Sequence, residues 1–269
     1  MPYVRDCEIL ENENVAPGHF RLRIEAPEIA QEARPAQFCM LQIQPGYYPL
    51  LRRPMSFERV YESSVSLLYK VAGDGTRLLS EARVGQEISV QGPLGNGFPL
   101  EEDFDRHILV AGGIGVAPFP ALAEALVSEL GRRPEVIIAA RTKSAILCDD
   151  YFAELGCDTY VATDDGSLGV QGNAAQMLEE LHPGPRDRVY VCGPMIMMST
   201  TSEVAVRAGA SCLVALEAQM ACGDGVCLGC VVESKKELEG EKMVRVCCDG
   251  PVFDTTIIDW EAHNMAYDR

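Results

Sequence analysis

The feature of this sequence that most constrains its fold is a change of hydrophobic pattern near His107. From there, apolar runs typical of buried strands, such as HILVAGG and PEVIIAAR, alternate with helical runs such as FPALAEALVSELG. The alternation continues to the helical run MIMMSTTSEVAVRAG, which ends at Gly209. Strands that alternate with helices predict a parallel sheet covered by its crossover helices. We therefore predict an α/β domain over residues 103–212.

Two other regions flank this α/β stretch. Before it, short runs such as HFRLRIEAP and SVSLLYKVA alternate partly between apolar and polar residues, and Gly, Pro and Asp separate them. This pattern is typical of a small antiparallel β-barrel or sandwich, which we predict over residues 1–102. After it, residues 213–269 break the α/β pattern and contain closely spaced cysteines. We therefore predict a third, small domain at the C-terminal end.

Composition and charge disfavour several classes of function. A formal net charge of −17 over 269 residues would repel nucleic acid and anionic membrane surfaces, so neither is an expected partner. The opening MPYVRDCEIL lacks the apolar region of a secretory signal. The most apolar stretch, residues 108–127, contains glycines, prolines and Glu124, which suit a strand, loop and helix better than a membrane span. We expect a cytoplasmic protein whose eleven cysteines stay reduced.

The cysteine cluster is the clearest candidate for a cofactor site. The segment MACGDGVCLGC contains Cys222, Cys227 and Cys230, and the pair Cys247–Cys248 follows. A C-x4-C-x2-C spacing with a later cysteine is that of plant-type [2Fe–2S] sites. Structural zinc usually has paired C-x2-C knuckles or histidine ligands, and none of the four histidines lies near these cysteines. We therefore predict an iron–sulfur cluster, although spacing alone leaves open whether Cys247 or Cys248 is its fourth ligand.

Further segments are typical of flavin and nucleotide sites. LLRRPMSF has arginines that can clamp a pyrophosphate and a serine that can hydrogen-bond a flavin ring. YKVAGDGTRLLS follows, and its glycines and a helix start near Thr76 suit a phosphate. VAGGIGVAP and CGPMIMM each join a predicted strand to a predicted helix, where a dinucleotide can approach. Each segment alone is a weak signal, because a tight turn or core packing explains it equally well.

Together and in this order, these segments resemble the ferredoxin-reductase-like flavoproteins. Within them, MACGDGVCLGC, the ending VCCDGPVF and the element LLRRPMS are similar to the electron-transfer subunits of NAD-dependent dihydroorotate dehydrogenases. The resemblance covers almost the whole chain. It implies a multidomain β plus α/β fold: an antiparallel β-barrel FAD domain at residues 1–102, an α/β NAD-binding domain at residues 103–212 and a [2Fe–2S] domain at residues 213–269.

The resemblance also implies which residues hold the cofactors. For FAD it implies residues of the first domain: Arg53, Pro54, Met55, Ser56, Leu68, Tyr69, Lys70, Gly75 and Thr76. For iron it implies Cys222, Cys227, Cys230 and Cys247, and Cys248 stands where relatives carry another side chain. For NAD it implies Gly113 and Gly115, with Cys192 near the nicotinamide. The redox cofactors carry the chemistry, so we assign no catalytic residue.

We expect the nucleotide to be NAD rather than NADP. The predicted strand TYVATDD ends at Asp164 and Asp165, where a carboxylate would accept hydrogen bonds from the adenosine ribose and repel a 2′-phosphate. We give this role to Asp165, and the alternative is an ordinary turn, because DDGS is good turn chemistry. Arg141 and Lys143 follow the preceding strand and are contrary signs, since either could pair with a phosphate.

The function that the resemblance implies is electron transfer in pyrimidine (UMP) biosynthesis. A flavin exchanges a hydride with NAD and single electrons with a cluster, so FAD must stand between them. The implied route runs from dihydroorotate to the FMN of a catalytic partner subunit, then to the cluster, FAD and NAD, in a heterotetramer with two copies of each subunit. The alternatives are a subunit of a hydrogenase or of a ferredoxin–NADP reductase complex, and a zinc-stabilised interaction protein.

Overall fold

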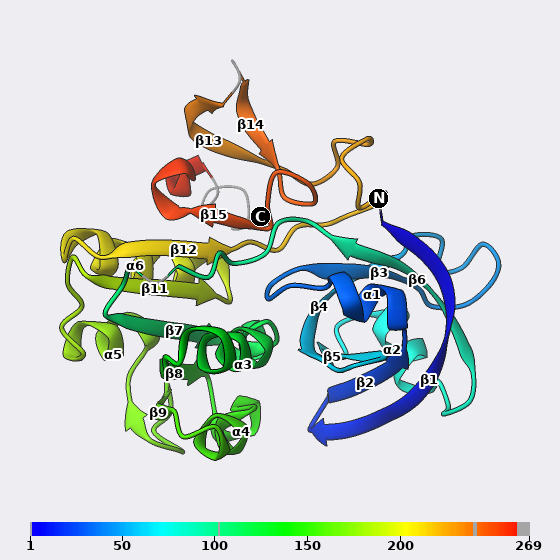
Figure 1. Ribbon diagram of the computed structural model, residues 1–269, viewed down its shortest axis with the longest axis horizontal. Coiled ribbons are helices and arrows are strands. Elements are labelled where there is room, and N and C mark those ends of the chain that lie inside the picture. Colours follow the sequence, from blue (N-terminus) through cyan, green and yellow to red (C-terminus); the bar gives the residue numbers. More distant parts are fainter. Residues whose placement is uncertain (1, 102, 239–240, 263–269) are drawn as a thin grey trace.

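The first part of the chain forms a closed antiparallel barrel (Figure 1). The computed structural model describes residues 2–101, 103–238 and 241–262. Around the barrel the strands follow the order β1-β2-β5-β4-β3-β6. Their bounds are β1 Tyr3–Ala16, β2 His19–Glu25, β3 Phe38–Gln42, β4 Arg53–Val60, β5 Ser64–Lys70 and β6 Glu87–Leu94. Two short helices, α1 (Pro27–Glu32) and α2 (Asp74–Ser80), complete this part of the chain.

The barrel closes around side chains that alternate along its strands. In β6, for example, Ile88, Val90 and Leu94 are buried, while their neighbours in sequence are more exposed. This alternation follows from the pleat of a strand, which turns successive side chains to opposite faces. The interior is filled mainly by aliphatic and aromatic residues, such as Leu22 and Phe57. The strand pairing, which closes from β1 round to β6, makes this part a barrel rather than a sandwich.

The second part is an α/β domain built on one seven-stranded sheet. The strand order is β10-β9-β8-β7-β11-β12-β15, and the strands are parallel except for β15. Their bounds are β7 Arg106–Gly112, β8 Glu135–Ala140, β9 Asp158–Thr163, β10 Val170–Gln171, β11 Asp187–Cys192, β12 Ser211–Ala215 and β15 Val252–Asp254. The helices are α3 Phe119–Leu130, α4 Asp149–Glu154, α5 Ala174–Glu180 and α6 Met195–Arg207, with 3-10 turns at η1 Gly113–Val116, η2 Lys143–Ala145 and η3 Thr255–Ile257.

Both faces of the central strands β7, β8 and β11 are mostly buried, which explains the apolar runs in these strands. On one face, Leu109 and Ala111 of β7 pack in the same core cluster as Phe119 of α3. On the other face, Ile108 and Val110 belong to a cluster that includes residues of α5 and α6. The predicted fold class, an antiparallel barrel followed by an α/β parallel-sheet domain and a small C-terminal part, is thus confirmed.

The last part of the chain contributes to the sheet and adds a hairpin. Strand β13 (Val231–Leu238) pairs with β14 (Glu241–Arg245), and this hairpin stands above the sheet in Figure 1. Strand β15 then returns to pair antiparallel with β12. The predicted domain boundary at residues 212/213 falls inside β12, and residues from both sides of it share one core. The three domain ranges remain predictions.

The apolar segment Gly113–Leu130 is the one stretch of the described chain that is long and apolar enough to cross a membrane. It comprises η1 and α3, and 61% of it is buried inside the protein. Residues such as Phe119 and Leu122 of α3 are fully buried against the sheet. Its place in the core of the α/β domain therefore accounts for its composition.

A polar contact joins the barrel to the α/β domain. Arg59 of β4 lies 2.9 Å from the carboxylate of Glu124 on α3. The hydroxyl of Tyr151, on α4, donates to the same carboxylate, and the Arg59 guanidinium lies over the Tyr151 ring. All three side chains are partly buried, so this network limits how the two parts can move relative to each other.

Candidate functional site

A cavity of about 330 Å³ lies where the barrel, the α/β domain and the C-terminal part meet. The barrel contributes residues of β3, β4, β5 and the start of α2, and the other parts contribute the remaining wall. Eight of the nine residues predicted to contact FAD line it: Arg53, Pro54, Met55, Ser56, Leu68, Tyr69, Lys70 and Thr76. We call this space the flavin cavity. The structure thus brings the two predicted FAD segments together on adjacent strands.

The ninth residue, Gly75, does not line the cavity, but the position of the Arg53 side chain explains why residue 75 is a glycine. A Cβ atom at Gly75 would lie 2.6 Å from Nε of Arg53, so only glycine lets the guanidinium lie against the start of α2. Thr76 fixes this turn, because its hydroxyl oxygen accepts hydrogen bonds from the backbone N–H groups of Ala72 (2.9 Å) and Gly73 (3.2 Å). A guanidinium held at this place fits a pyrophosphate. The largely apolar remainder of the cavity fits a flavin ring.

The loops that follow β7 and β11 interlock at the carboxyl edge of the sheet. A Cβ atom at Gly115 would lie 2.5 Å from the carbonyl oxygen of Cys192, and one at Gly112 would lie 2.3 Å from Sδ of Met197. Gly113 differs, because its φ is +53° and the space beside it is open. Close packing therefore accounts for Gly115, whereas Gly113 leaves room for a ligand.

The sheet order places these two loops where a nucleotide is expected. From β7 the chain moves outward through β8 and β9, and β11 then lies on the other side of β7. Ligands of open α/β sheets bind at such a switch point, beyond the carboxyl ends of the strands. Cys192 ends β11 at this edge and is 3% exposed. Burial, and then the charge of Glu217, raise the pKa of its thiol, so it stays protonated.

Asp165 follows β9 at the same edge and closes a turn. Its carboxylate accepts hydrogen bonds from the backbone N–H of Ser167 (3.0 Å) and from the Ser167 hydroxyl (2.6 Å). These hydrogen bonds lower the pKa of Asp165, so the carboxylate is charged at neutral pH. The neighbouring Asp164 is exposed. The turn geometry that the sequence offered as an alternative is therefore present, and the role of Asp165 toward a ribose remains a prediction.

The cluster cysteines lie in two close pairs. Sγ of Cys222 and Sγ of Cys227 are 3.3 Å apart, and the backbone N–H of Cys247 donates to Sγ of Cys230 over 3.4 Å. The backbone N–H of Gly229 also donates to Sγ of Cys227. N–H donors to the sulfurs are among the features that tune the potential of iron–sulfur sites.

This paired arrangement suits a binuclear cluster better than a single ion. Within the described residues, no three Cys, His, Asp or Glu side chains gather around one metal position. A [2Fe–2S] cluster does not need such a group, because each of its irons takes only two protein ligands. A tetrahedral zinc ion would need all four thiolates around one point. The two close pairs therefore match the two thiolates that each iron of a [2Fe–2S] cluster takes.

Cys247 and Cys248 have different surroundings. Cys247 is 1% exposed and lies beside Cys230, whereas Cys248 is partly exposed. Sγ of Cys248 lies 3.7 Å from a carboxylate oxygen of Asp249. It also fills the place that a Cβ atom of Gly225 would take, at 2.6 Å. These contacts support Cys247 as the fourth ligand.

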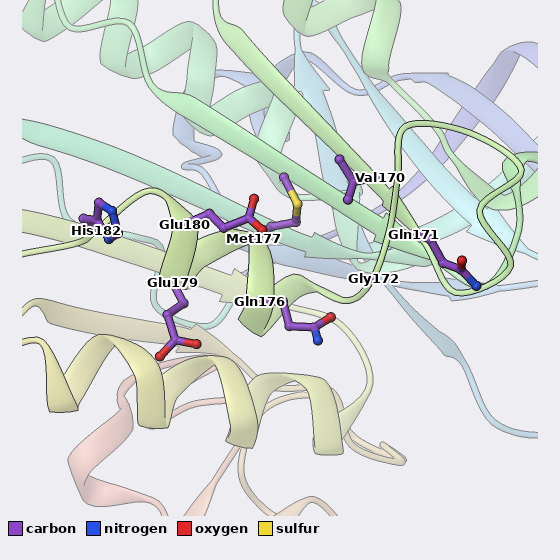
Figure 2. Close-up of a pocket in the computed structure, with 8 residues that line it drawn as sticks. All are labelled: Val170, Gln171, Gly172, Gln176, Met177, Glu179, Glu180 and His182. Atoms are coloured by element: carbon purple, nitrogen blue, oxygen red, sulfur yellow. The ribbon is translucent and has the colours of Figure 1, made fainter.

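A second cavity, of about 340 Å³, lies beside β10 and α5 (Figure 2). Its lining includes Glu179, Glu180 and His182 at the end of α5, and Val170 and Gln171 of β10. None of the predicted site residues lines it. Its chemistry matches none of the three cofactors, because it offers neither thiolates nor a cation for a phosphate.

The structure also places residues at the flavin cavity that the sequence did not single out. Ile114 and Ala117 come from the nucleotide loop, and Glu217 and Met220 come from the segment between β12 and the cluster. Glu217 had one sequence signal, since it is the single acid in the mostly apolar run LVALEAQMA, whose only other polar residue is Gln219. Only the folded chain brings these distant segments to one wall.

Comparisons with known proteins agree with this geometry. Residues 217–259 match the family described as the iron-sulfur cluster binding domain of dihydroorotate dehydrogenase B, and residues 109–203 match the oxidoreductase NAD-binding domain. A dihydroorotate dehydrogenase B (NAD(+)) electron transfer subunit of Desulforamulus reducens is 36% identical over 264 residues, which cover 97% of this chain and 100% of that protein. The subunit of the same name from Bacillus cereus (strain Q1) is 36% identical over 250 residues, 91% of this chain and 94% of that protein.

Solved structures show the same architecture. A chain from the structure of an NADH-dependent reduced ferredoxin-NADP oxidoreductase superposes with a TM-score of 0.83 at 29% identity, covering 95% of this chain and 90% of that one. The ferredoxin reductase of a carbazole 1,9a-dioxygenase superposes with a TM-score of 0.66 at 18% identity, covering 78% of this chain and 67% of that one. The second likeness concerns the fold alone.

Proposed function

Because this chain belongs to the family of electron transfer subunits of NAD-dependent dihydroorotate dehydrogenase B, we propose that it carries electrons from the FMN of a catalytic partner subunit to NAD. In this proposal Cys222, Cys227, Cys230 and Cys247 ligate the [2Fe–2S] cluster. The flavin cavity holds FAD, with Arg53 at its pyrophosphate and the Ser56 hydroxyl at its ring. The Gly113 loop and Cys192 receive the nicotinamide nucleotide.

The observation that carries the proposal is the position of the flavin cavity between the other two sites. One part of its wall is the segment that includes Glu217 and Met220, and Cys222 follows two residues after Met220. Another part is Ile114 and Ala117, which belong to the loop after β7. A group bound in the cavity would thus lie next to both the cluster loop and the nucleotide loop.

The residues of the chain would position the cofactors and exclude water. Bound FAD exchanges a hydride with NAD and single electrons with a cluster, which is why it must occupy the middle position. Phe38, Leu68 and Met220 give the cavity its apolar surface. Lys70 ends β5 beside Tyr69, whose hydroxyl is held by Asn12 inside the barrel at 3.0 Å. The cavity therefore keeps a fixed shape on its barrel side.

The partner subunit would dock over the cluster loop. Val226 and Leu228 flank Cys227 and are 81% and 59% exposed, although both are apolar. Exposed apolar residues around a redox centre are typical of a protein interface. We propose that the FMN-containing catalytic subunit covers them, in a heterotetramer with two copies of each subunit. None of the eleven cysteines, all of which lie in the described residues, forms a disulfide, which suits the proposed cytoplasmic location.

Reconstitution with the catalytic subunit tests this function. The FAD- and iron-loaded chain, mixed with an FMN-containing dihydroorotate dehydrogenase subunit, should form a stable complex that reduces NAD with dihydroorotate. Val226→Glu should weaken the complex at least tenfold, because burying an unpaired carboxylate costs more than ~1.4 kcal/mol. Met243→Glu, at an exposed position on β14, is the matched control for an added charge. A chain that stays monomeric and passes no electrons to the partner would contradict the proposal.

We expect NADH to be preferred over NADPH in this chain. The carboxylates of Asp164 and Asp165 at the end of β9 would repel a 2′-phosphate. The measurement is kcat/KM for reduction of a dye by each nucleotide, repeated in Asp164→Ala and Asp165→Ala. A preference for NADPH would refute the assignment and favour a ferredoxin–NADP reductase function. If both variants keep the NADH preference, the assignment of NAD stands, but the two carboxylates are not its cause.

A further inference from the structure

Strand β4 serves both the flavin cavity and the junction between the barrel and the α/β domain. Its first residues, 53–56, line the flavin cavity. Its later residues Glu58 and Arg59 both contact the α/β domain. Consecutive side chains of a regular strand point to opposite faces, but the pairing of β4 with β5 shifts between Phe57 and Arg59. This β-bulge re-aims the two side chains, so both reach the same neighbour.

Arg59 makes the first of these contacts. Its Nε and Nη2 atoms lie 3.0 and 2.9 Å from one carboxylate oxygen of Glu124 on α3. Its guanidinium lies over the ring of Tyr61, 5.0 Å from the ring centre, and over the ring of Tyr151 on α4, at 4.6 Å. The Tyr151 hydroxyl donates to the same carboxylate, and burial raises the pKa of that hydroxyl, so it stays a donor. With only 33% of the Arg59 side chain and 29% of the Glu124 side chain exposed, solvent screens this pair less than an ion pair at the open surface.

Glu58 makes the second contact and fixes the start of α4. Its carboxylate is 1% exposed and accepts hydrogen bonds of 2.7 to 3.0 Å from the guanidinium of Arg21. Sγ of Cys148, the residue before α4, lies 3.8 Å from the same carboxylate. Cys148 has a φ of +63°, a left-handed conformation that persists in a residue other than glycine only where its surroundings fix it. The helix that carries Tyr151 is therefore held against the barrel beside Arg59.

The two elements that Arg59 joins also carry walls of the flavin cavity. On the barrel side, Ser56 lines the cavity three residues before Arg59. On the other side, Ile114 and Ala117 line it, and the helix α3 that carries Glu124 begins two residues after Ala117. In Figure 1, α3 lies on the side of the sheet that faces the barrel. Because a rigid helix transmits displacement along its length, holding Glu124 against Arg59 also holds the nucleotide loop against the barrel wall of the cavity.

Hydride transfer between the nucleotide and the flavin depends on the distance between the two rings. In this step the C4–H bond of NADH breaks, and the hydrogen passes with both bonding electrons to the flavin, which leaves NAD⁺. The reacting atoms must approach to about 3–3.5 Å. We propose that Arg59 is a positioning residue for this step, because its contacts with Glu124 and Tyr151 set the distance between the nicotinamide and the flavin. This inference rests on the proposed function, because it requires FAD and the nucleotide at the two walls.

Two reductants separate hydride transfer from the other properties of the flavin. Arg59→Met keeps most of the length of the side chain and removes its charge. In the FAD- and iron-loaded chain, this variant should reduce the rate of flavin reduction at saturating NADH about tenfold, since a misplacement of about 1 Å can cost on the order of 100-fold. Reduced methyl viologen supplies electrons without a nicotinamide, so its reaction with the flavin should keep the wild-type rate.

A conservative variant and a matched control accompany this change. Arg59→Lys retains a cation for Glu124 and should recover part of the lost rate. Arg5→Met is the matched control, because Arg5 lies 3.0 Å from the carboxylate of Glu28 and 5.2 Å from the ring centre of Tyr3, yet all three residues belong to the barrel part of the chain. It should reduce the flavin with NADH at the wild-type rate.

An absorption spectrum reports the same distance without turnover. The analogue 1,4,5,6-tetrahydro-NAD cannot give up a hydride, and stacking of its ring on an oxidised flavin produces a long-wavelength charge-transfer band. At a saturating concentration of the analogue, the wild type and Arg5→Met should show this band, and Arg59→Met should lose most of it. A residue that only stabilised the fold would leave the band of the folded, FAD-loaded protein unchanged.

The outcomes separate this inference from the function on which it rests. A wild-type rate and band in Arg59→Met, or an equal loss of rate with both reductants, would overturn the role of Arg59 and leave the proposed function intact. If Arg59→Met does not retain FAD, Tyr151→Phe decides, because it removes only the hydroxyl that Glu124 accepts. This variant should lose part of the band, and a full wild-type band would overturn the role. A wild-type chain that binds no FAD would overturn both.

Discussion

Cys247→Ser should abolish the iron–sulfur cluster and leave most of the flavin in place. Cys247 is buried beside Cys230, so its loss would leave one iron with a single thiolate, and a hydroxyl is a poor replacement for that soft ligand. Iron should fall from roughly two atoms per chain to near zero, together with the cluster absorbance. FAD should stay bound, because most of its predicted contacts come from β4 and β5 of the barrel.

The neighbouring cysteine provides the matched control. Cys248→Ser removes a thiol one position away that lies against Asp249 and Gly225, is partly exposed, and hydrogen-bonds with Cys247. It should retain the iron and the visible spectrum of the wild type. Iron lost from Cys248→Ser and kept in Cys247→Ser would invert the ligand assignment. Zinc in place of iron in the wild type would contradict the cluster itself.

Much of the fold could be predicted because its signals are local. The alternation along β6 and the continuous apolar run of β7 follow directly from one-sided and two-sided burial. The edge strand β15 could not be found in this way, because its three residues, Val252–Asp254, are too few to show a period. It is a strand because β12 offers it an unpaired edge, which is a tertiary effect.

The candidate site also combines features with a local sequence signal and features that only tertiary structure creates. The cysteine spacing is a local signal, and the structure places Cys222 beside Cys227 and Cys230 beside Cys247. The flavin cavity depends on contacts between segments far apart in sequence, so Ile114 and Glu217 could not be assigned to it in advance. The turn at Asp165, which the sequence offered as an alternative, is present, because its carboxylate accepts a hydrogen bond from the backbone N–H of Ser167.

The last expected result concerns the two interlocked loops at the nucleotide edge. Gly115→Ala should destabilise the chain by about 3 kcal/mol, the upper part of the range for overpacking. The reason is that its Cβ would lie 2.5 Å from the carbonyl oxygen of Cys192 and 2.6 Å from Cα of Gly193. These are backbone atoms, so relief requires the loops after β7 and β11 to separate. The melting temperature should fall on the order of 10 °C, and the KM for NADH should rise because both loops are displaced.

Gly113→Ala is the matched control in the same loop. Gly113 has φ of +53° with open space at the Cβ position, so alanine there meets no atom and carries only the strain of the left-handed conformation, about 1 kcal/mol. Thermal unfolding of the two variants, measured side by side, checks the expectation for stability, and NADH kinetics are compared between Gly115→Ala and the wild type. A larger loss of stability in Gly113→Ala than in Gly115→Ala would show that backbone conformation, rather than the close approach of the two loops, holds this edge together.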